Sequence, residues 1–405
     1  MIEEASHIRL LRAVGTARTG CSERAASTAR TRSASEYSGD DEYRPEPVAA
    51  PEPPAWCDGS VRIGIHTSIA GDIAGSLDSA RKLGCNALQI FSASPRMWPR
   101  AGGRLAPAEA ERFRARRAEL GLGPLVIHAN YLINLASSDP VMRVRTIQVF
   151  HDEMQRAAAL GADFLVVHPG AARGAEMPEA IRAVAEGLRH AARGVRLAGS
   201  FADMARGGLR VLLENTSGMG SCLGARFAEL RAILDQISEL PLGVCLDTAH
   251  AFEAGYDVRT ETGLEQMLTE LDGDVGLARV PIVHVNDSKT SLGSRVDRHE
   301  HIGRGQIGRK AFGRILTHPR LAAGGPGGLP GRAFILETPI DAPGDDRRNV
   351  RALWELAGVP LKQAPRAENG FSMQRARPKG IGTKRRAKVQ KKSRRAAKPR
   401  AEQKG

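Results

Sequence analysis

The sequence predicts an α/β protein whose fold is a (β/α)8 TIM barrel. Eight short apolar runs alternate with helical segments over roughly 300 residues. Turn residues bound each run, as is typical of fully buried parallel strands. The main alternative is a doubly wound open sheet, which would normally carry a glycine-rich phosphate turn after its first strand. Gly71-Asp72-Ile73-Ala74-Gly75 is a poor match for such a turn, so the barrel is favoured.

The eight apolar runs are the expected barrel strands. They comprise residues 61–66, 87–91, 124–128, 163–168, 209–214, 242–247, 280–285 and 333–337. The segments between them have helical patterns. Asp139-Pro140, for example, combines an N-cap residue with proline at the first helical position, and Gly161 supplies a stop. The residues between these signals keep apolar side chains at helical spacing.

The two ends of the chain differ in composition from the part between them. Residues 1–59 are rich in Ala, Ser, Arg, Glu and Pro without periodicity, which predicts a disordered extension before a barrel domain at 60–360. Residues 361–405 are expected to form a disordered basic tail. From Arg366 onward the tail holds fifteen basic and two acidic residues, so it carries nearly all of the net charge of +14.

The five cysteines are widely spaced, and none forms a CxxC pair. This pattern argues against a disulfide framework and a cysteine zinc site, and it favours a reducing compartment. No stretch approaches the roughly 18 apolar residues of a membrane span, so no membrane association is expected.

Six of the predicted strands end in a histidine or a carboxylate. A barrel gathers the carboxyl ends of its strands around one mouth, where the active sites of this fold lie. Imidazole and carboxylate are ligands suited to zinc and similar divalent ions. One such residue at a strand end is usually an ordinary polar group, but six in succession predict a metal centre. The six are His128, His168, Glu214, Asp247, His284 and Glu337.

Two further segments extend this set. His250 follows Asp247 by one helical turn, and Asp297 and His299 lie two positions apart on the same side of an extended segment. These three residues could form an additional metal site beside the strand ends. His66, at the end of the first strand, could orient a ligand or a bound water. Several closely spaced divalent ions are suited to in-line displacement at phosphorus, so the residues favour metal-assisted phosphoester hydrolysis.

Several longer motifs resemble the endonuclease IV family, the apurinic/apyrimidinic endonucleases of base excision repair. The resemblance covers about residues 61–358 and follows the family's order. The motifs are HANYLINL at 128–135, HPG at 168–170, ENT at 214–216, CLDTAHA at 245–251, NDSK at 286–289, GSRVDRH at 293–299, GRGQIG at 303–308 and LET at 336–338.

The resemblance implies three zinc ions, some of which manganese could replace. It assigns His128 and His168 to the first ion, with Glu214 bridging to the second. Asp247, His284 and Glu337 complete the second site, and His250, Asp297 and His299 hold the third. Catalysis is assigned to Glu214, Glu337 and His250. The implied reaction is hydrolysis of the phosphodiester 5′ to an abasic site, together with removal of 3′-blocking groups.

The resemblance also implies contacts with double-stranded DNA that contains abasic sites. Arg96 matches a residue that enters the base stack, and Tyr131 and Leu132 match residues that wedge at the lesion. Ser94 and Pro95 stand where the family usually has polar amide residues, so the finer DNA contacts are expected to differ. A monomer in the bacterial cytoplasm is expected.

Two other functions would use parts of the same sequence. Sugar isomerases and epimerases of the xylose-isomerase type share the barrel but need a single divalent metal. Glu214, Asp247, His284 and Glu337 would satisfy them, but His128, His168 and the Asp297/His299 pair would then be surplus. A non-enzymatic DNA-binding scaffold would not need an intact ligand set.

The basic tail is expected to tether the protein to DNA, and the alternative is a solvated tail without a specific role. Fifteen positive charges can neutralise phosphates, and the affinity gained in this way falls as salt rises. We expect deletion of residues 366–405 to weaken DNA binding and flatten its salt dependence, while single-turnover cleavage stays intact. Binding measured over a range of salt concentrations checks this, and an unchanged slope would contradict it.

Overall fold

The structure is a computed structural model that describes residues 60–95, 97–98, 105–202, 207–322 and 332–359. All of them belong to the unit that spans Ala50–Gly405. The two expected disordered segments, residues 1–59 and 361–405, lie outside the described residues.

Eight parallel strands form a single sheet in the order β1-β10-β7-β6-β5-β4-β3-β2. Each lies within one of the eight predicted runs, so the predicted strands and the α/β barrel fold are confirmed. The strands are β1 (Arg62–Ile65), β2 (Leu88–Phe91), β3 (Leu125–His128), β4 (Phe164–Val167), β5 (Arg210–Glu214), β6 (Leu242–Asp247), β7 (Ile282–His284) and β10 (Ala333–Leu336).

The barrel closes where β1 meets β2. No continuous ladder joins these two strands. A single parallel bridge pairs His66 with Gln89, and the amide of Thr67 donates to the carbonyl of Gln89 at 2.9 Å. The first and last strands of the sheet therefore lie side by side, and the carboxyl ends of all eight strands face one mouth.

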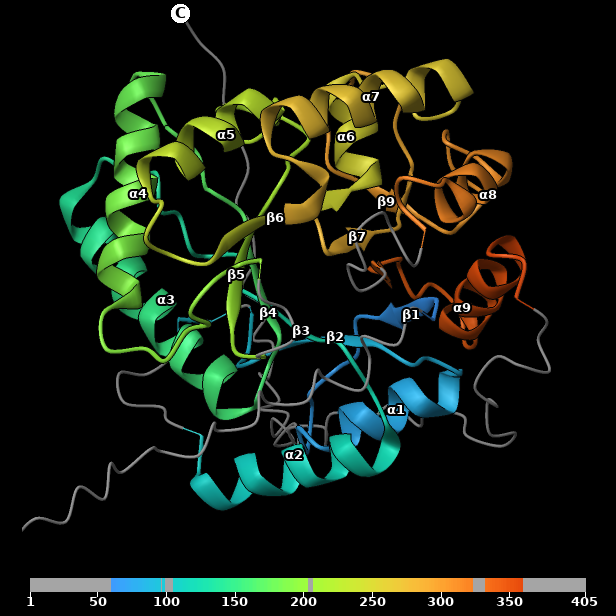
Figure 1. Ribbon diagram of the computed structural model, residues 1–405, viewed down its shortest axis with the longest axis horizontal. Helices are drawn as coiled ribbons and strands as arrows, with labels where there is room; N and C mark the ends of the chain where they lie inside the picture. Colours follow the sequence, from blue (N-terminus) through green and yellow to red (C-terminus); the bar gives the residue numbers. More distant parts are fainter. Residues whose placement is uncertain (1–59, 96, 99–104, 203–206, 323–331, 360–405) are drawn as a thin grey trace, which may run out of the picture. The chain divides into compact units, whose positions relative to one another are not determined.

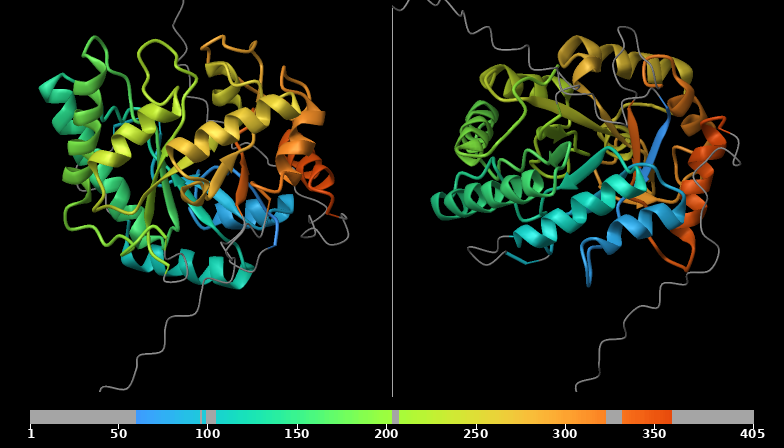
Figure 2. Two further views of the ribbon diagram at one scale, coloured as in Figure 1. Left: turned by 45° about the horizontal axis from the view of Figure 1, so that its top comes forward. Right: turned by 60° about the horizontal axis from the view of Figure 1, so that its bottom comes forward.

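The helices surround the strands (Figures 1 and 2). In α3, the Asp139 carboxylate accepts from the amide of Met142 at 2.7 Å, as the predicted N-cap requires. The helices are α1 (Gly75–Leu83), α2 (Pro107–Leu120), α3 (Pro140–Ala159), α4 (Met177–Ala192), α5 (Phe227–Gln236), α6 (Thr248–Ala254), α7 (Glu261–Asp274), α8 (Arg309–Thr317) and α9 (Asp345–Leu356). Among the described residues, none of these is long and apolar enough to cross a membrane.

Two short strands, β8 (Asp287–Ser288) and β9 (His299–Glu300), pair antiparallel beyond the end of β7. The connection between them, residues 289–298, has no regular secondary structure. Of the predicted metal ligands, Asp297 lies near its far end, and His299 is the first residue of β9.

Candidate metal centre

The interior of the barrel changes from apolar to polar over two residues in seven of its eight strands. Because side chains alternate between the two faces of a strand, residues two apart point the same way. An apolar interior layer includes Ala87, Val126, Val166, Leu212, Cys245, Ile282 and Ile335. Two positions further along each strand stand, in the same order, Gln89, His128, His168, Glu214, Asp247, His284 and Glu337. The fold therefore collects the six predicted strand-end residues in one polar layer at the mouth.

Glu214 belongs to this layer and is fully buried. Its Oε2 is 3.0 Å from Nε2 of His128 and 3.3 Å from Nε2 of His168. Its Oε1 is 2.8 Å from Nδ1 of His284. The two oxygens of one carboxylate thus face two different groups of ligand atoms, which is the geometry that a bridging ligand requires.

His284 faces carboxylates on one side and an amide on the other. Its Nε2 lies 2.8 Å from Oε1 of Gln89, which can only accept, so Nε2 carries the proton. Its Nδ1 faces Glu214 and lies 3.3 Å from Glu337 Oε2. The ligand atoms of Glu214, Asp247, His284 and Glu337 all lie within 4.8 Å of one another.

A third cluster joins Asp247 to the segments beyond the strands. The ligand atoms of Asp247, His250 and His299 lie within 4.8 Å of one another. Asp297 adjoins them, with Oδ2 3.3 Å from Nε2 of His250 and Oδ1 3.8 Å from Nε2 of His299. The structure thus brings all nine predicted ligands together in three adjoining clusters, and Asp247 lies within reach of both the second and the third.

The hydrogen bonds of the histidines fit a set of cations between these groups. Nδ1 of His128 donates to the carbonyl of Ala129, and Nδ1 of His250 donates to that of Asn215. The opposite nitrogen of each neutral ring is then a lone pair directed at carboxylate oxygens, which repel it. Nε2 of His250 and Nε2 of His299 are buried and have no hydrogen-bond partner among the described residues. A cation between an imidazole nitrogen and a carboxylate oxygen would accept a lone pair from each of them. The set of ligand atoms therefore fits divalent metal ions.

The electrostatics of the site also call for positive charge. Burial alone would lower the pKa of His250, but Asp247 and Asp297 raise it well above the usual value. Burial alone would raise the pKa of Glu214, but His168 and His284 hold it well below its usual range. Glu214 is therefore ionised, and the carboxylates around His250 favour positive charge at that position.

Three amide side chains that the sequence interpretation did not single out hold the ligands in place. Gln89 accepts from His284 and donates to both Glu337 and His66. Asn286 donates to Asp247 Oδ2 at 2.7 Å, and Asn215 accepts from the amide of Asp247 at 2.6 Å. Gln89 had a detectable signal, because it is the one polar residue in the apolar run 87–91.

His66 lies beside the metal-type ligands at the end of β1. Its Nδ1 is 3.0 Å from Gln89 Nε2 and 3.7 Å from Glu337 Oε1, and its buried Nε2 has no hydrogen-bond partner in the part of the chain that the structure describes. This position agrees with an orienting residue for Glu337 or for a water, which remains a prediction.

A fourth group of ligand-type residues lies outside the centre. Its histidine does not offer a free lone pair to a metal ion. The group consists of Glu300, His301 and Asp341. Asn349 Nδ2 donates to Nδ1 of His301 at 3.0 Å, so Nε2 of this ring carries the proton and faces Asp341 as a donor. The contact is a histidine–carboxylate bridge between loops.

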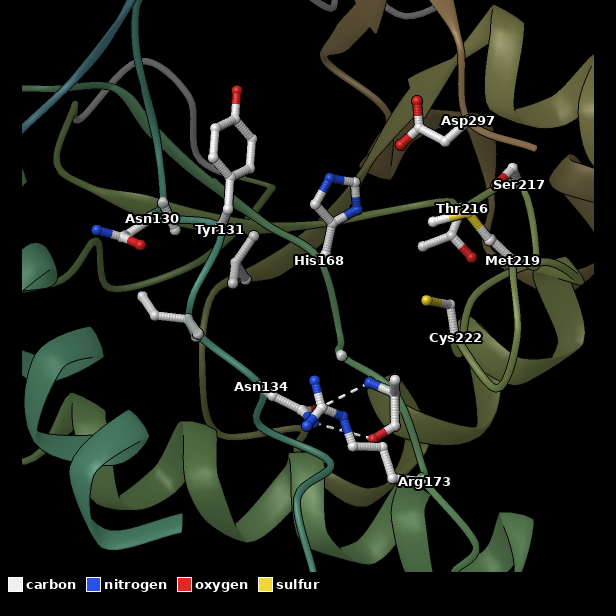
Figure 3. Close-up of a pocket in the computed structure, with 15 residues that line it drawn as sticks. Asn130, Tyr131, Asn134, His168, Arg173, Thr216, Ser217, Met219, Cys222 and Asp297 are labelled. Carbon is white, nitrogen blue, oxygen red and sulfur yellow. Dashed lines mark hydrogen bonds between the residues drawn. The ribbon is translucent and has the colours of Figure 1, made fainter. Parts of the chain in front are cut away.

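A pocket of about 280 Å³ opens beside the centre. Figure 3 shows His168 on its wall, between Tyr131 and Asp297 in this view. Tyr131 is 66% exposed and packs edge-on against Phe91, with ring centroids 5.3 Å apart. A substrate in this pocket would contact an aromatic ring and two of the predicted ligands.

Asn130 joins the two segments in which DNA contacts are predicted. Its Nδ2 donates to the carbonyls of Ser94 and Met97, and its Oδ1 accepts from the amide of Leu132. Leu132 is half-buried beside Tyr131. Arg96, the third predicted contact, lies outside the described residues.

The chain is similar in sequence and in structure to several known proteins. The family model of the xylose isomerase-like TIM barrel matches residues 77–353. A probable endonuclease 4 from Solibacter usitatus is 48% identical over 305 residues, covering 74% of this chain and 98% of the relative. The crystal structure of endonuclease IV from Thermus thermophilus is 42% identical, with a TM-score of 0.61 over 73% of this chain and 99% of that one. A D-tagatose 3-epimerase-like protein, 18% identical with a TM-score of 0.54 over 74% of this chain and 97% of its own, shares the fold.

Proposed function

The chain belongs to the endonuclease IV family of xylose isomerase-like TIM barrels, and on this premise we propose that it hydrolyses the DNA phosphodiester 5′ to abasic sites. Removal of 3′-blocking groups is part of the same proposal. The observation that carries it is the set of three adjoining clusters linked through Glu214 and Asp247. A sugar isomerase needs a single metal and would leave the first and third clusters without a role.

The proposal assigns one zinc ion to each cluster, with manganese as an alternative occupant. His128, His168 and Glu214 would hold the first ion. Glu214, Asp247, His284 and Glu337 would hold the second, and Asp247, His250, Asp297 and His299 the third. When bound, such ions supply Lewis acidity toward phosphate oxygens and hydroxide at neutral pH.

Within this proposal the chain's own residues fix the geometry in which an in-line attack can occur. The family resemblance assigns Glu214, His250 and Glu337 to catalysis, and each of the three contacts members of two clusters. Glu214 belongs to the first and second. His250 lies 3.5 Å from Glu214 and 3.3 Å from Asp297, and the carbonyl of Glu337 lies 3.4 Å from Nδ1 of His299. Since amide side chains hold several ligands in place, little reorganisation is needed when the phosphate arrives.

The pocket beside the centre is the proposed site for the extrahelical abasic nucleotide. A nucleotide without its base has lost its stacking, so it leaves the helix at lower cost than an intact one. Tyr131 and Leu132 would fill the space that it leaves, and Arg96 is proposed to enter the stack from the neighbouring segment. Asn130 keeps the two segments together while DNA binds.

Replacing Tyr131 with alanine should weaken binding of abasic duplex more than it slows the chemical step. Stacking on an aromatic side chain contributes about 1–3 kcal/mol per base, which corresponds to roughly 5- to 150-fold in affinity. Fluorescence anisotropy with abasic and undamaged duplexes measures this change. Tyr131→Phe keeps the ring and serves as the matched control. Equal affinities of Tyr131→Ala and the unaltered protein would contradict the proposed role.

The direct test of the proposed function is incision of a duplex with one abasic site. We expect a single cut on its 5′ side that EDTA abolishes, no cut in the undamaged duplex, and no turnover of a ketose. Metal analysis of the same sample should give three ions per chain. Ketose epimerisation with one bound metal would overturn the proposal.

We further infer that the protein acts as a monomer in the cytoplasm. One chain supplies every ligand of the three clusters, so the site needs no partner subunit. Cys85, Cys222 and Cys245 are free thiols, in keeping with a reducing compartment. Sedimentation with and without abasic duplex tests the oligomeric state.

A further inference from the structure

The third cluster is built differently from the first two. Every ligand of the first two clusters stands at the end of a barrel strand or directly after it, where ladder hydrogen bonds fix the backbone. Asp297 instead lies in the irregular connection 289–298, and its side chain is 44% exposed, while His299 follows in the two-residue strand β9, which pairs only with β8 among the described residues. The geometry of the third cluster therefore depends on whatever holds this connection against the barrel.

Glu253 is the side chain that holds it. This residue lies in α6 one turn after His250 and is fully buried. Its Oε1 accepts from Ser288 Oγ at 2.7 Å, from Thr290 Oγ1 at 3.3 Å and from the amide of Arg298 at 3.2 Å. One oxygen thus joins the start of the connection to its end, and the Arg298 amide lies between the two ligands Asp297 and His299.

The backbone of α6 holds the middle of the same connection. The amide of Gly293 donates to the carbonyl of Phe252 at 3.1 Å, and the amide of Arg295 donates to that of Glu253 at 3.0 Å. The same helix presents His250 to the cluster from its first turn. One short helix therefore supplies one ligand directly and, beside the β8–β9 pairing, holds the segment that carries the other two.

The buried position of the Glu253 carboxylate lowers the stability of the fold. Its Oε2 is buried and has no hydrogen-bond partner among the described residues. An unsatisfied buried polar group lowers the stability of a fold, and its presence in a native protein calls for an explanation. Holding a ligand-bearing loop in a fixed position is an explanation that the contacts of Oε1 support.

We propose that Glu253 is a positioning residue that sets the affinity of the third cluster for its cation. The inference rests on the proposed function, in which the clusters hold metal ions. It implies that the third ion is the first to be lost to a chelator, and that loss of Glu253 widens this difference while leaving the first two sites unchanged.

The test compares zinc binding by the full-length protein and three variants. The samples are dialysed against zinc buffers of graded free concentration, and bound zinc is counted by atomic emission. In Glu253→Ala we expect two ions to bind as in the unaltered protein, and the third with roughly 10- to 100-fold lower affinity, the usual effect of losing an outer hydrogen-bond partner. Glu253→Gln keeps an oxygen that can accept from the same donors and should bind the third ion nearly normally.

Glu153→Ala is the matched control. Glu153 is also a buried glutamate that accepts from a serine hydroxyl, Ser92 Oγ at 2.7 Å, but it lies in α3 away from the connection. The Glu153→Ala variant should leave the affinity for the third ion unchanged. Hydrogen exchange of the amides at 289–298 in metal-free protein supplies a second readout, and it should be faster in Glu253→Ala alone.

Two results would overturn the inference. One is a folded Glu253→Ala protein with unaltered third-ion affinity, and the other is an equal loss in Glu153→Ala, which would indicate general destabilisation. If Glu253→Ala does not fold, Ser288→Ala removes the 2.7 Å donor instead and should show a smaller loss of the same kind; no loss in that variant would overturn the inference. An unaltered protein that binds a single zinc ion would instead refute the three-ion assignment of the proposed function.

Discussion

Replacing Glu214 with alanine is expected to lower the rate of abasic-duplex incision by more than about 100-fold. Loss of a residue that only hydrogen-bonds to a metal ligand costs up to about 100-fold, and loss of a ligand itself should cost more. The two oxygens of Glu214 face different clusters, at 3.0 Å from His128 and 2.8 Å from His284. Alanine removes a ligand from both clusters and the negative charge between them. The spacing of the two ions, on which in-line displacement depends, would then have no common anchor.

Two variants isolate the cause of this loss. Glu214→Gln keeps the size of the side chain but removes its charge, so it should lose activity almost as fully. Glu261→Ala, at the exposed start of α7, should cleave normally. Single-turnover incision and metal content are measured for each. Normal cleavage by a folded Glu214→Ala protein would show that this carboxylate does not bridge the reacting ions.

The fold and most of the centre could be predicted because both follow from local pattern. A buried parallel strand must be apolar on both faces, so a histidine or carboxylate at its end is conspicuous in the sequence. All eight strands lie within runs that this pattern indicates, and the family assigned from the motifs is confirmed by the relatives. The metal-binding and catalytic roles of the individual residues stay predictions.

The supporting residues could not be predicted in the same way, because their partners are distant in the sequence. Gln89 acts on His284, 195 positions away, and nothing in either local pattern indicates this pairing. Glu253 is hidden for another reason. A glutamate in a short helix is ordinarily a solvated residue, but Glu253 is fully buried and the connection 289–298 donates hydrogen bonds to it. The sharing of Asp247 between two clusters likewise depends on where that connection lies.

Removing the metal ions should inactivate the protein and also lower its melting temperature. An ion present at 1,000 times its dissociation constant stabilises the folded state by about 4 kcal/mol, which corresponds to a rise in melting temperature of several degrees for a domain of this size. The effect should be clear here because the metal-free site leaves carboxylates of three clusters facing imidazole nitrogens in a buried layer. Circular dichroism melting of EDTA-treated and untreated protein measures it.

Adding metal ions back to the EDTA-treated protein shows which ions restore incision and melting temperature. Zinc should restore both incision and melting temperature, whereas magnesium, which prefers oxygen ligands in an octahedron, should restore neither at these histidine-rich clusters. Restoration by manganese would show that it can occupy at least part of the set.

His128→Ala removes a ligand of the first cluster, so its melting temperature should rise less than that of the unaltered protein when zinc is added. A melting temperature that is the same with and without EDTA, in a protein shown to have lost its metal, would mean that the buried imidazoles neutralise the carboxylates as well as cations do.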